Sequence, residues 1–150
     1  MKKKKILRAL LFVLTFATLA FIWIHSMMPE SASSEESRGV LEFLKPFLEL
    51  FFGKGNVTVH LVRKLAHLAE YAAFGFELAL IFNMYVGGFW KRIRAGLNTA
   101  LIVAFIDETI QIFSGRGPQI SDMWIDLAGA AIGTLCALVI LLLVGRKKEE

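Results

Sequence analysis

The sequence lacks most features that would mark it as a soluble enzyme or a disulfide-stabilised secreted protein. It has one cysteine, Cys136, so an intrachain disulfide is excluded. No internal repeat is visible, and no motif has the spacing that is diagnostic of a metal site. Ser114 and Ser121 have no adjacent histidine, which disfavours catalysis by an ordinary serine nucleophile. These absences leave few recognised enzyme classes open.

Apolar residues, by contrast, are abundant and grouped into long runs. They make up 56% of the 150 residues, and the mean hydropathy is +0.60, whereas soluble domains average about 45–50% apolar residues. The runs are near the length that crosses about 30 Å of hydrocarbon. The formal net charge is +4, but the basic residues flank the apolar runs, so nucleic-acid binding is disfavoured. We expect one all-α integral membrane domain over residues 1–150.

Four apolar segments predict a polytopic bundle of four transmembrane helices, at residues 6–28, 63–86, 95–113 and 122–144. The first follows a basic cluster and could be a signal peptide. It is longer than a usual signal-peptide core, however, and Ser-Ala-Ser at 31–33 is only a fair cleavage site, so an uncleaved helix is favoured. Ser121 is expected to cap the fourth helix.

Basic residues predict the orientation of this bundle. Most of the 17 Lys and Arg lie in the N-terminal cluster, in a short loop at 91–94 and in the C-terminal tail. Four spans place all three on one side, which the positive-inside rule makes cytoplasmic. We therefore expect both termini in the cytoplasm of a bacterial plasma membrane protein, with residues 29–62 and 114–121 outside.

The segment 29–57 reads as an acidic, serine-containing linker followed by an amphipathic helix at Val40–Phe52. Ser33 and Glu36 have capping-box spacing for a helix start. Pro46 is expected to kink or divide the helix. This extracytoplasmic amphipathic segment is too short to span, so it either lies in the interface or folds back onto the bundle.

Polar residues gather at one depth in the spans, near their outer ends. Charged groups cost roughly 2.5–3.5 kcal/mol each near the bilayer centre on insertion scales, so such a group favours a functional site. Helical phase predicts that they face one another and form a polar funnel open to the outside. The candidate ligand-binding residues are Lys64, His67, Glu70, Asp107, Glu108, Gln111, Arg116, Asp122 and Asp126.

Several interpretations of these residues stay open. His67 and Glu70 could be a buried structural pair with a neighbouring base, and Arg116 could anchor headgroups or grip a phosphate or carboxylate. The carboxylates could share protons or bind a cation. One histidine with several carboxylates would suit Mg, Mn or Zn; the candidates are His67, Glu70, Glu108, Asp122 and Asp126. No particular cofactor is indicated.

Two further features lie deeper in the spans. Gly129 and Gly133 have the GxxxG spacing that allows close helix contact, so they are expected to be packing positions. Glu77 lies too deep to join the outer cluster and is expected to pair with a basic residue of the cytoplasmic side. Neither feature indicates a ligand.

The polar residues occur in a pattern that resembles the VanZ-like family, named for a protein of teicoplanin resistance. The matching pieces, over about residues 60–135, are Arg63–Tyr71 with Gly75, Asp107–Gln111, Gly115–Gly117, Asp122 with Asp126, and Gly129 with Gly133. Asp126 departs from the pattern, because the family is expected to have asparagine there more often. The resemblance implies a small polytopic bacterial membrane protein of the cell envelope, linked in some members to reduced teicoplanin susceptibility.

Three functions follow as hypotheses. The first is a non-enzymatic protein that binds a lipid headgroup or amphiphile in the outer leaflet and so reduces access of a lipoglycopeptide. The second is an intramembrane enzyme, metal-dependent or not, acting on a lipid-linked phosphate or cell-wall precursor. In it Glu108 or Asp122 would be the base, His67 the acid or base, and Arg116 the anion clamp. The third is a structural or assembly protein whose polar core only holds the bundle together.

Overall fold

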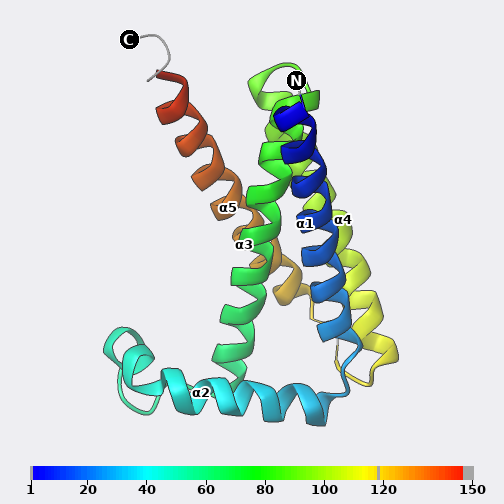
Figure 1. Cartoon of the computed structure of the whole chain (residues 1–150). Helices are drawn as coiled ribbons and strands as arrows, with labels where there is room; N and C mark the ends of the chain where they lie inside the picture. Colours follow the sequence, from blue (N-terminus) through cyan, green and yellow to red (C-terminus); the bar gives the residue numbers. More distant parts are fainter. Residues whose placement is uncertain (1, 118, 147–150) are drawn as a thin grey trace.

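The chain folds into five helices and is all-helical over the residues that the structure, a computed structural model, describes: 2–117 and 119–146. In chain order the helices are α1 (Lys2–Met27), α2 (Glu30–Phe52), α3 (Val59–Tyr85), α4 (Phe89–Phe113) and α5 (Ile120–Arg146). The four long helices other than α2 run up and down, and α2 lies across one end of them (Figure 1).

The four long helices are long and apolar enough to cross a membrane, which confirms the four predicted spans. At about 1.5 Å per residue, a helix of this length exceeds the roughly 30 Å of hydrocarbon. The helices therefore extend past the apolar runs at one or both ends. The expected basic loop at 91–94 is wrong for this reason: these residues form the first turns of α4. Lys and Arg are good helix formers, and their long side chains can reach the headgroups from inside a helix.

The segment after α1 also differs from its prediction, because helix α2 begins at Glu30 and includes the expected linker. The capping box at Ser33 is wrong: the residue before the helix is Pro29, and the Ser33 amide already donates a helical hydrogen bond to the Pro29 carbonyl (3.0 Å). Pro46 does not divide the helix. It lies on the exposed side of α2, where its missing N–H leaves only an exposed carbonyl without its helical donor.

Helix α2 packs against the start of α3 with one apolar stripe. Leu48 is buried against Val57 and Val62. Other large side chains of α2 remain largely exposed, such as Phe43, which is 84% exposed. Helix α2 thus lies across the ends of the four spans (Figure 1) and packs onto α3, while it keeps apolar side chains exposed on its other sides; both the interfacial and the folded-back alternatives allow this position. The turn that follows contains two glycines with positive φ, Gly53 and Gly55.

The tightest packing in the bundle joins α3 to α5 through glycines. A Cβ atom added at Gly133 would meet the backbone of Ala72 and Phe76, and one at Gly75 would meet the backbone of Ala130. Gly129 lies equally close to the backbone of α3. The prediction that Gly129 and Gly133 are packing positions is confirmed.

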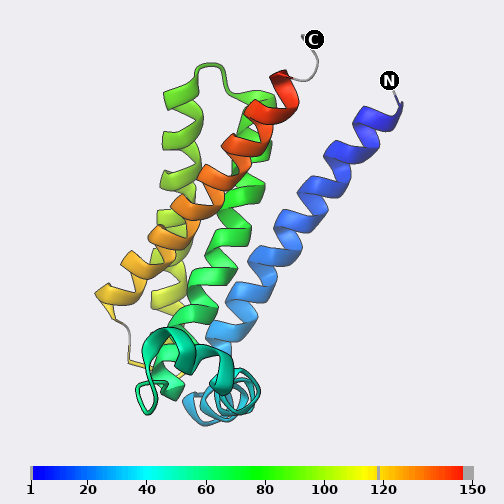
Figure 2. The ribbon, with the colours of Figure 1, turned by 90° about the vertical axis from the view of Figure 1, so that its left-hand side faces the viewer.

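Helix α1 packs less closely, touching the others mainly near its C-terminal end. Ile22 joins the core cluster with Tyr71 and Phe74, whereas the beginning of α1 leans away from the bundle (Figure 2). Halfway along, Thr18 donates a 3.0 Å hydrogen bond to Glu77. Glu77 therefore pairs with a hydroxyl group instead of the expected basic residue, because α1 lies nearer to it than either basic helix end.

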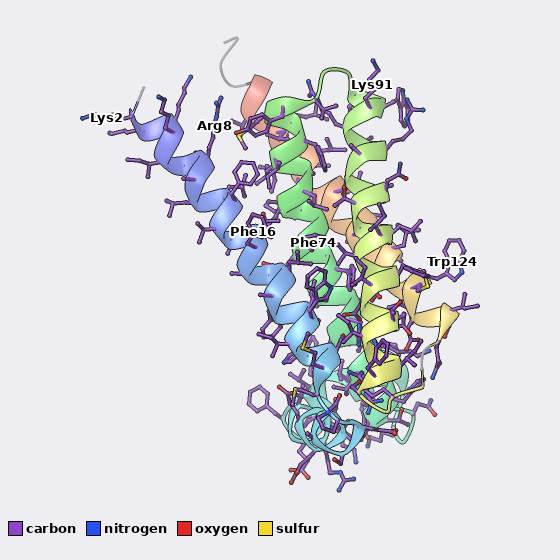
Figure 3. The ribbon with its side chains drawn as sticks, turned by 90° about the vertical axis from the view of Figure 1, so that its right-hand side faces the viewer. Lys2, Arg8, Phe16, Phe74, Lys91 and Trp124 are labelled. Carbon is purple, nitrogen blue, oxygen red and sulfur yellow. The ribbon has the colours of Figure 1, made fainter. Side chains whose placement is uncertain are left out.

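Charge separates the two ends of the bundle. Lys2, Arg8 and Lys91 lie at the end opposite α2 (Figure 3), to which the start of α1 and the end of α5 both belong (Figure 1). We call the end that carries α2 the α2 end and the other the basic end.

Ser121, expected as a cap, lies instead inside the first turn of α5, with its Oγ 3.2 Å from Gln119 Oε1.

Candidate functional site

The polar side chains of the spans meet at the α2 end. The last turn of α1, the first turns of α3, the end of α4 and the start of α5 all lie there, because the helices alternate in direction. Every one of the nine candidate residues belongs to these turns or to the connection between α4 and α5. The structure therefore brings the sequence-derived candidates to one end, though into distinct groups.

The most buried group joins α3, α4 and α5. It consists of His67, Asp107 and Asp126, each of which offers one nitrogen or oxygen atom within 4.8 Å of the others. His67 Nδ1 lies 3.4 Å from Asp126 Oδ1. Asp107 and Asp126 are 0% exposed. We call these three residues the buried triad.

Helix α4 supports the buried triad through a glutamine. Gln111 Nε2 donates to Asp107 Oδ2 and to Glu108 Oε1, each at 3.1 Å. The second Glu108 oxygen accepts from the Gln119 backbone amide at 2.8 Å. Asp107 also accepts a hydrogen bond from Ser26 of α1. Glu108 is thus held at both oxygens and is not part of the buried triad.

Two further carboxylates are paired with bases elsewhere. Asp122 lies 3.4 Å from Lys64 Nζ, an ion pair between the first turns of α5 and α3. Glu70 accepts from His25 Nδ1 at 3.1 Å, and the other ring nitrogen of His25 lies 3.5 Å from Glu36 of α2. The metal set expected from sequence is therefore only partly brought together: His67 and Asp126 meet Asp107, whereas Glu70, Glu108 and Asp122 have other partners.

A cavity of about 130 Å³ lies next to the buried triad, between α2 and the ends of the spans. Its polar lining residues are Ser33, Glu36 and Ser37 of α2, His25 of α1, Arg63, His67 and Glu70 of α3, and Arg116. We call it the anion cavity, because it contains two guanidinium groups that make no ion pair with the carboxylates of the described residues.

The two arginines of the anion cavity keep free donors. Arg63 donates to Ser34 Oγ at 2.8 Å, and Arg116 donates to the His25 carbonyl at 3.2 Å. The Nε of each arginine is buried and has no hydrogen-bond partner among the described residues. Burial, and then the neighbouring Arg63 guanidinium, lower the pKa of Arg116. An anion between the two groups would relieve both effects.

An apolar depression adjoins the anion cavity on the open side of the bundle. It lies between α1 and α3, has a volume of about 450 Å³, and is lined by Ala17, Thr18, Phe21, Ala69, Glu70 and Ala73. Glu70 belongs to both spaces. We call it the α1–α3 groove. The polar cavity and the apolar groove thus meet at the Glu70 side chain.

Sequence reasoning missed the residues that α1 and α2 supply. His25 and Ser26 interrupt the apolar run at the end of α1, and this is the signal by which they could have been found. Ser34 and Glu36 were missed because their segment was interpreted as a linker. The Gln119 amide carries no side-chain signal at all.

The sequence model of the VanZ/LLP1 family matches residues 10–142. The chain belongs to the VanZ/LLP1 family. The match covers all four spans, so α1, which the resemblance over about residues 60–135 left out, is part of the VanZ/LLP1 domain.

Family membership confirms the resemblance seen in the sequence, and the chain is a multi-span membrane protein of this family. No curated protein and no solved structure matches the chain. What the polar residues do must therefore be argued from their own geometry.

Proposed function

We propose that this VanZ/LLP1 protein binds the phosphate headgroup of an amphiphile at the outer leaflet of the bacterial plasma membrane. By doing so it lowers susceptibility to lipoglycopeptides of the teicoplanin type. The observation that carries the proposal is the pair of arginines in the anion cavity, which have free donors and no carboxylate partner among the described residues.

The arginines support a phosphate because of their geometry and burial. Arg116 is only 7% exposed, so an anion beside it would be largely removed from water and strongly attracted. Guanidinium groups bind phosphate through paired N–H donors. His67 also lines the cavity, whereas both ring nitrogens of His25 are already paired with Glu70 and Glu36.

The α1–α3 groove supports an amphiphile over a free anion. An acyl chain lying between α1 and α3 would contact Ala69, Ala73 and Phe21, while the headgroup reaches the anion cavity past Glu70. Inside a bilayer the acyl chain of the free ligand already lies in hydrocarbon, so its transfer into the groove gains little hydrophobic free energy. The groove therefore selects for shape and position, and the arginines supply the attraction.

The orientation belongs to the same proposal. Basic residues at the end opposite α2 favour a cytoplasmic basic end, with both termini inside and the anion cavity in the outer leaflet. Teicoplanin-type drugs carry a lipid tail, so a site that holds amphiphiles in that leaflet would act where these drugs insert.

A binding experiment tests the headgroup. Full-length protein would be reconstituted in nanodiscs or detergent and titrated with phosphatidylglycerol, phosphatidylcholine or inorganic phosphate. We expect phosphatidylglycerol to bind and the double variant Arg63→Gln/Arg116→Gln to bind at least tenfold more weakly. Arg38→Gln is the matched control, because Arg38 is exposed on α2 and does not line the anion cavity. Equal binding of phosphatidylglycerol by the wild type and the double variant would contradict the proposal. If inorganic phosphate binds as strongly as phosphatidylglycerol, the site binds a free anion and does not require an amphiphile.

A susceptibility experiment tests the biological role separately. A sensitive Gram-positive host would express the wild type, Arg116→Gln or Arg38→Gln, with membrane levels matched by blot. We expect the wild type and Arg38→Gln to raise the inhibitory concentration of teicoplanin several-fold more than that of vancomycin, and Arg116→Gln to lose this effect. If the wild type protects against neither drug, the resistance role fails for this protein even where lipid binding holds.

One observation favours the enzyme hypothesis as a second candidate: His67 lines the same cavity as Arg116, so an acid or base lies beside the anion cavity. The proposed bases fit less well, because Glu108 accepts at both oxygens and Asp122 is paired with Lys64. Incubation with a lipid-linked diphosphate, followed by thin-layer chromatography, distinguishes the candidates. A product that disappears in His67→Gln would support the enzyme.

A further inference from the structure

We infer that the buried triad, His67, Asp107 and Asp126, is a binding site for one divalent metal ion of the zinc or manganese class. The inference is independent of the proposed amphiphile binding, because it requires neither Arg63 nor Arg116. The two sites share only His67, which lines the anion cavity.

Geometry is the first argument. Three potential ligand atoms, one from each residue, lie within 4.8 Å of one another, and His67 Nδ1 and Asp126 Oδ1 are 3.4 Å apart. In a tetrahedral site with bonds of about 2.1 Å, two ligand atoms are separated by roughly 3.4 Å. Small side-chain rotations would therefore bring all three atoms to bonding distance of one ion.

Missing hydrogen bonds are the second and independent argument. Asp126 is 0% exposed, yet its oxygens make no hydrogen bond among the described residues, and His67 Nδ1 meets Asp126 Oδ1 only at an ion-pair distance of 3.4 Å. Buried polar atoms nearly always have partners, and a buried carboxylate without one is strongly unfavourable. A metal ion between these atoms would satisfy His67 and Asp126 together.

Charge is the third argument. Asp107 and Asp126 bring two carboxylates into the interior of a bundle, where like charges at this distance repel. The nearby Lys64 is paired with Asp122. A proton on His67 would compensate one carboxylate, whereas a divalent cation would compensate both.

Asp107 has the supporting contacts that metal-binding carboxylates usually have. Ser26 donates to one of its oxygens and Gln111 to the other. Each oxygen keeps a second lone pair, so these donors orient the carboxylate without blocking it. The support comes from α1 and from within α4 itself, and would hold Asp107 toward α3 and α5.

The donor set indicates the class of metal. Imidazole suits zinc and other first-row transition metals, while carboxylates also suit manganese, magnesium and calcium. One imidazole with two carboxylates thus favours Zn²⁺ or Mn²⁺ over a pure oxygen-ligand ion. Three protein ligands leave a fourth position for water or for an oxygen of a ligand in the anion cavity.

Metal analysis of the purified full-length protein tests the inference. The protein would be loaded with excess Zn²⁺ or Mn²⁺ in detergent, dialysed against metal-free buffer, and analysed by inductively coupled plasma mass spectrometry. We expect about one ion per chain in the wild type and less than a tenth of that in Asp126→Asn and in His67→Gln. Asp122→Asn is the matched control, since it makes the same chemical change one turn earlier in α5 and should retain the metal.

A second measurement decides the question if the triad variants do not fold. Chelator-treated wild type would be titrated with Co²⁺, whose visible absorption should rise and saturate at one equivalent. Wild-type protein that retains less than a tenth of an equivalent of every metal and gives no Co²⁺ bands would overturn the inference. Full metal content in folded Asp126→Asn, or equal loss in folded Asp122→Asn, would also overturn it.

Discussion

The two faces of α3 are packed in opposite ways. On one face α5 approaches so closely that Gly75, Gly129 and Gly133 leave no room for a Cβ atom. On the other face only the beginning of α1 leans away (Figure 2), and the α1–α3 groove lies beside the part of α1 that contacts α3. The same helix therefore carries a rigid contact and an open one, within a few residues of each other.

The difference separates two requirements of a site inside a membrane. Close backbone contact between α3 and α5 fixes His67 against Asp126, two polar groups whose interaction needs a defined geometry. Looser contact between α3 and α1 leaves the α1–α3 groove open beside Glu70, where the proposed amphiphile would lie. A bundle packed equally tightly on all sides would fix His67 and Asp126 in the same way but would have no groove between its helices.

The largest expected effect comes from filling the closed face. Gly133→Ala would drive its methyl group into the backbone of Ala72 and Phe76, and backbone cannot rotate away. We expect the free energy of unfolding to fall by about 3 kcal/mol, the upper end of the usual range for overpacking. The thermal midpoint and the yield of monodisperse protein would both fall. Gly145→Ala, where no atom of the described residues lies within 4 Å, should be neutral or slightly stabilising, because alanine is the better helix former. Equal behaviour of the two variants would mean that α3 and α5 do not pack in this way.

A moderate effect is expected where α1 touches the site. Ser26→Ala removes the hydroxyl that donates to Asp107. Because that aspartate is buried, we expect a cost of about 1–3 kcal/mol, the usual penalty for an unsatisfied buried polar group, measured by thermal unfolding in detergent. Ser31→Ala, at an exposed position of α2, should change the midpoint little. No destabilisation in Ser26→Ala would show that α1 does not support the buried triad.

The smallest effect on stability is expected on the open face. Ala69→Phe would place a ring in the α1–α3 groove, where space exists, so we expect a change within about 0.5 kcal/mol, as for other substitutions at sites without tight packing. Retention of phosphatidylglycerol during purification should nevertheless fall several-fold. Ala131→Phe, which faces outward on α5, is the control for added bulk. Unchanged lipid retention in Ala69→Phe would exclude the groove as the place of the acyl chain.

Much of the architecture could be predicted from the sequence because it depends on local properties. Apolar runs of sufficient length have few alternatives to spanning helices, so the four spans were found, with ends displaced by several residues. The ends failed where basic residues such as Lys91 continue a helix past the apolar run. Helix α2 failed for a similar reason: polar residues such as Ser33 and Glu36 indicate a linker or a cap, although they also fit an exposed helix.

The sequence predicted how deep the site residues lie along their helices, but it did not predict which residues contact one another. Spacing along each helix placed nine candidates near one end, but it could not tell which carboxylate meets which base. Glu108, Asp122 and Glu70 each acquired partners from other segments, namely the Gln119 amide, Lys64 and His25. Those partners depend on the rotation of each helix about its own axis, which the pattern of apolar residues constrains only loosely in a lipid environment.

The sequence alone therefore determined the class of protein, the four spans, the small-residue contact of α5 and the concentration of polar residues near one end. These follow from hydrophobic length, from the absence of side chains at glycine, and from the free energy of charge in hydrocarbon. Only the tertiary structure decided that Asp126 faces His67 and Asp107 with no hydrogen bond among the described residues, that Arg63 and Arg116 share a cavity, and that the beginning of α1 leans away from the bundle. The physical reason is that contacts between helices depend on their mutual rotation and tilt, which are set by packing across the whole bundle and by no single segment.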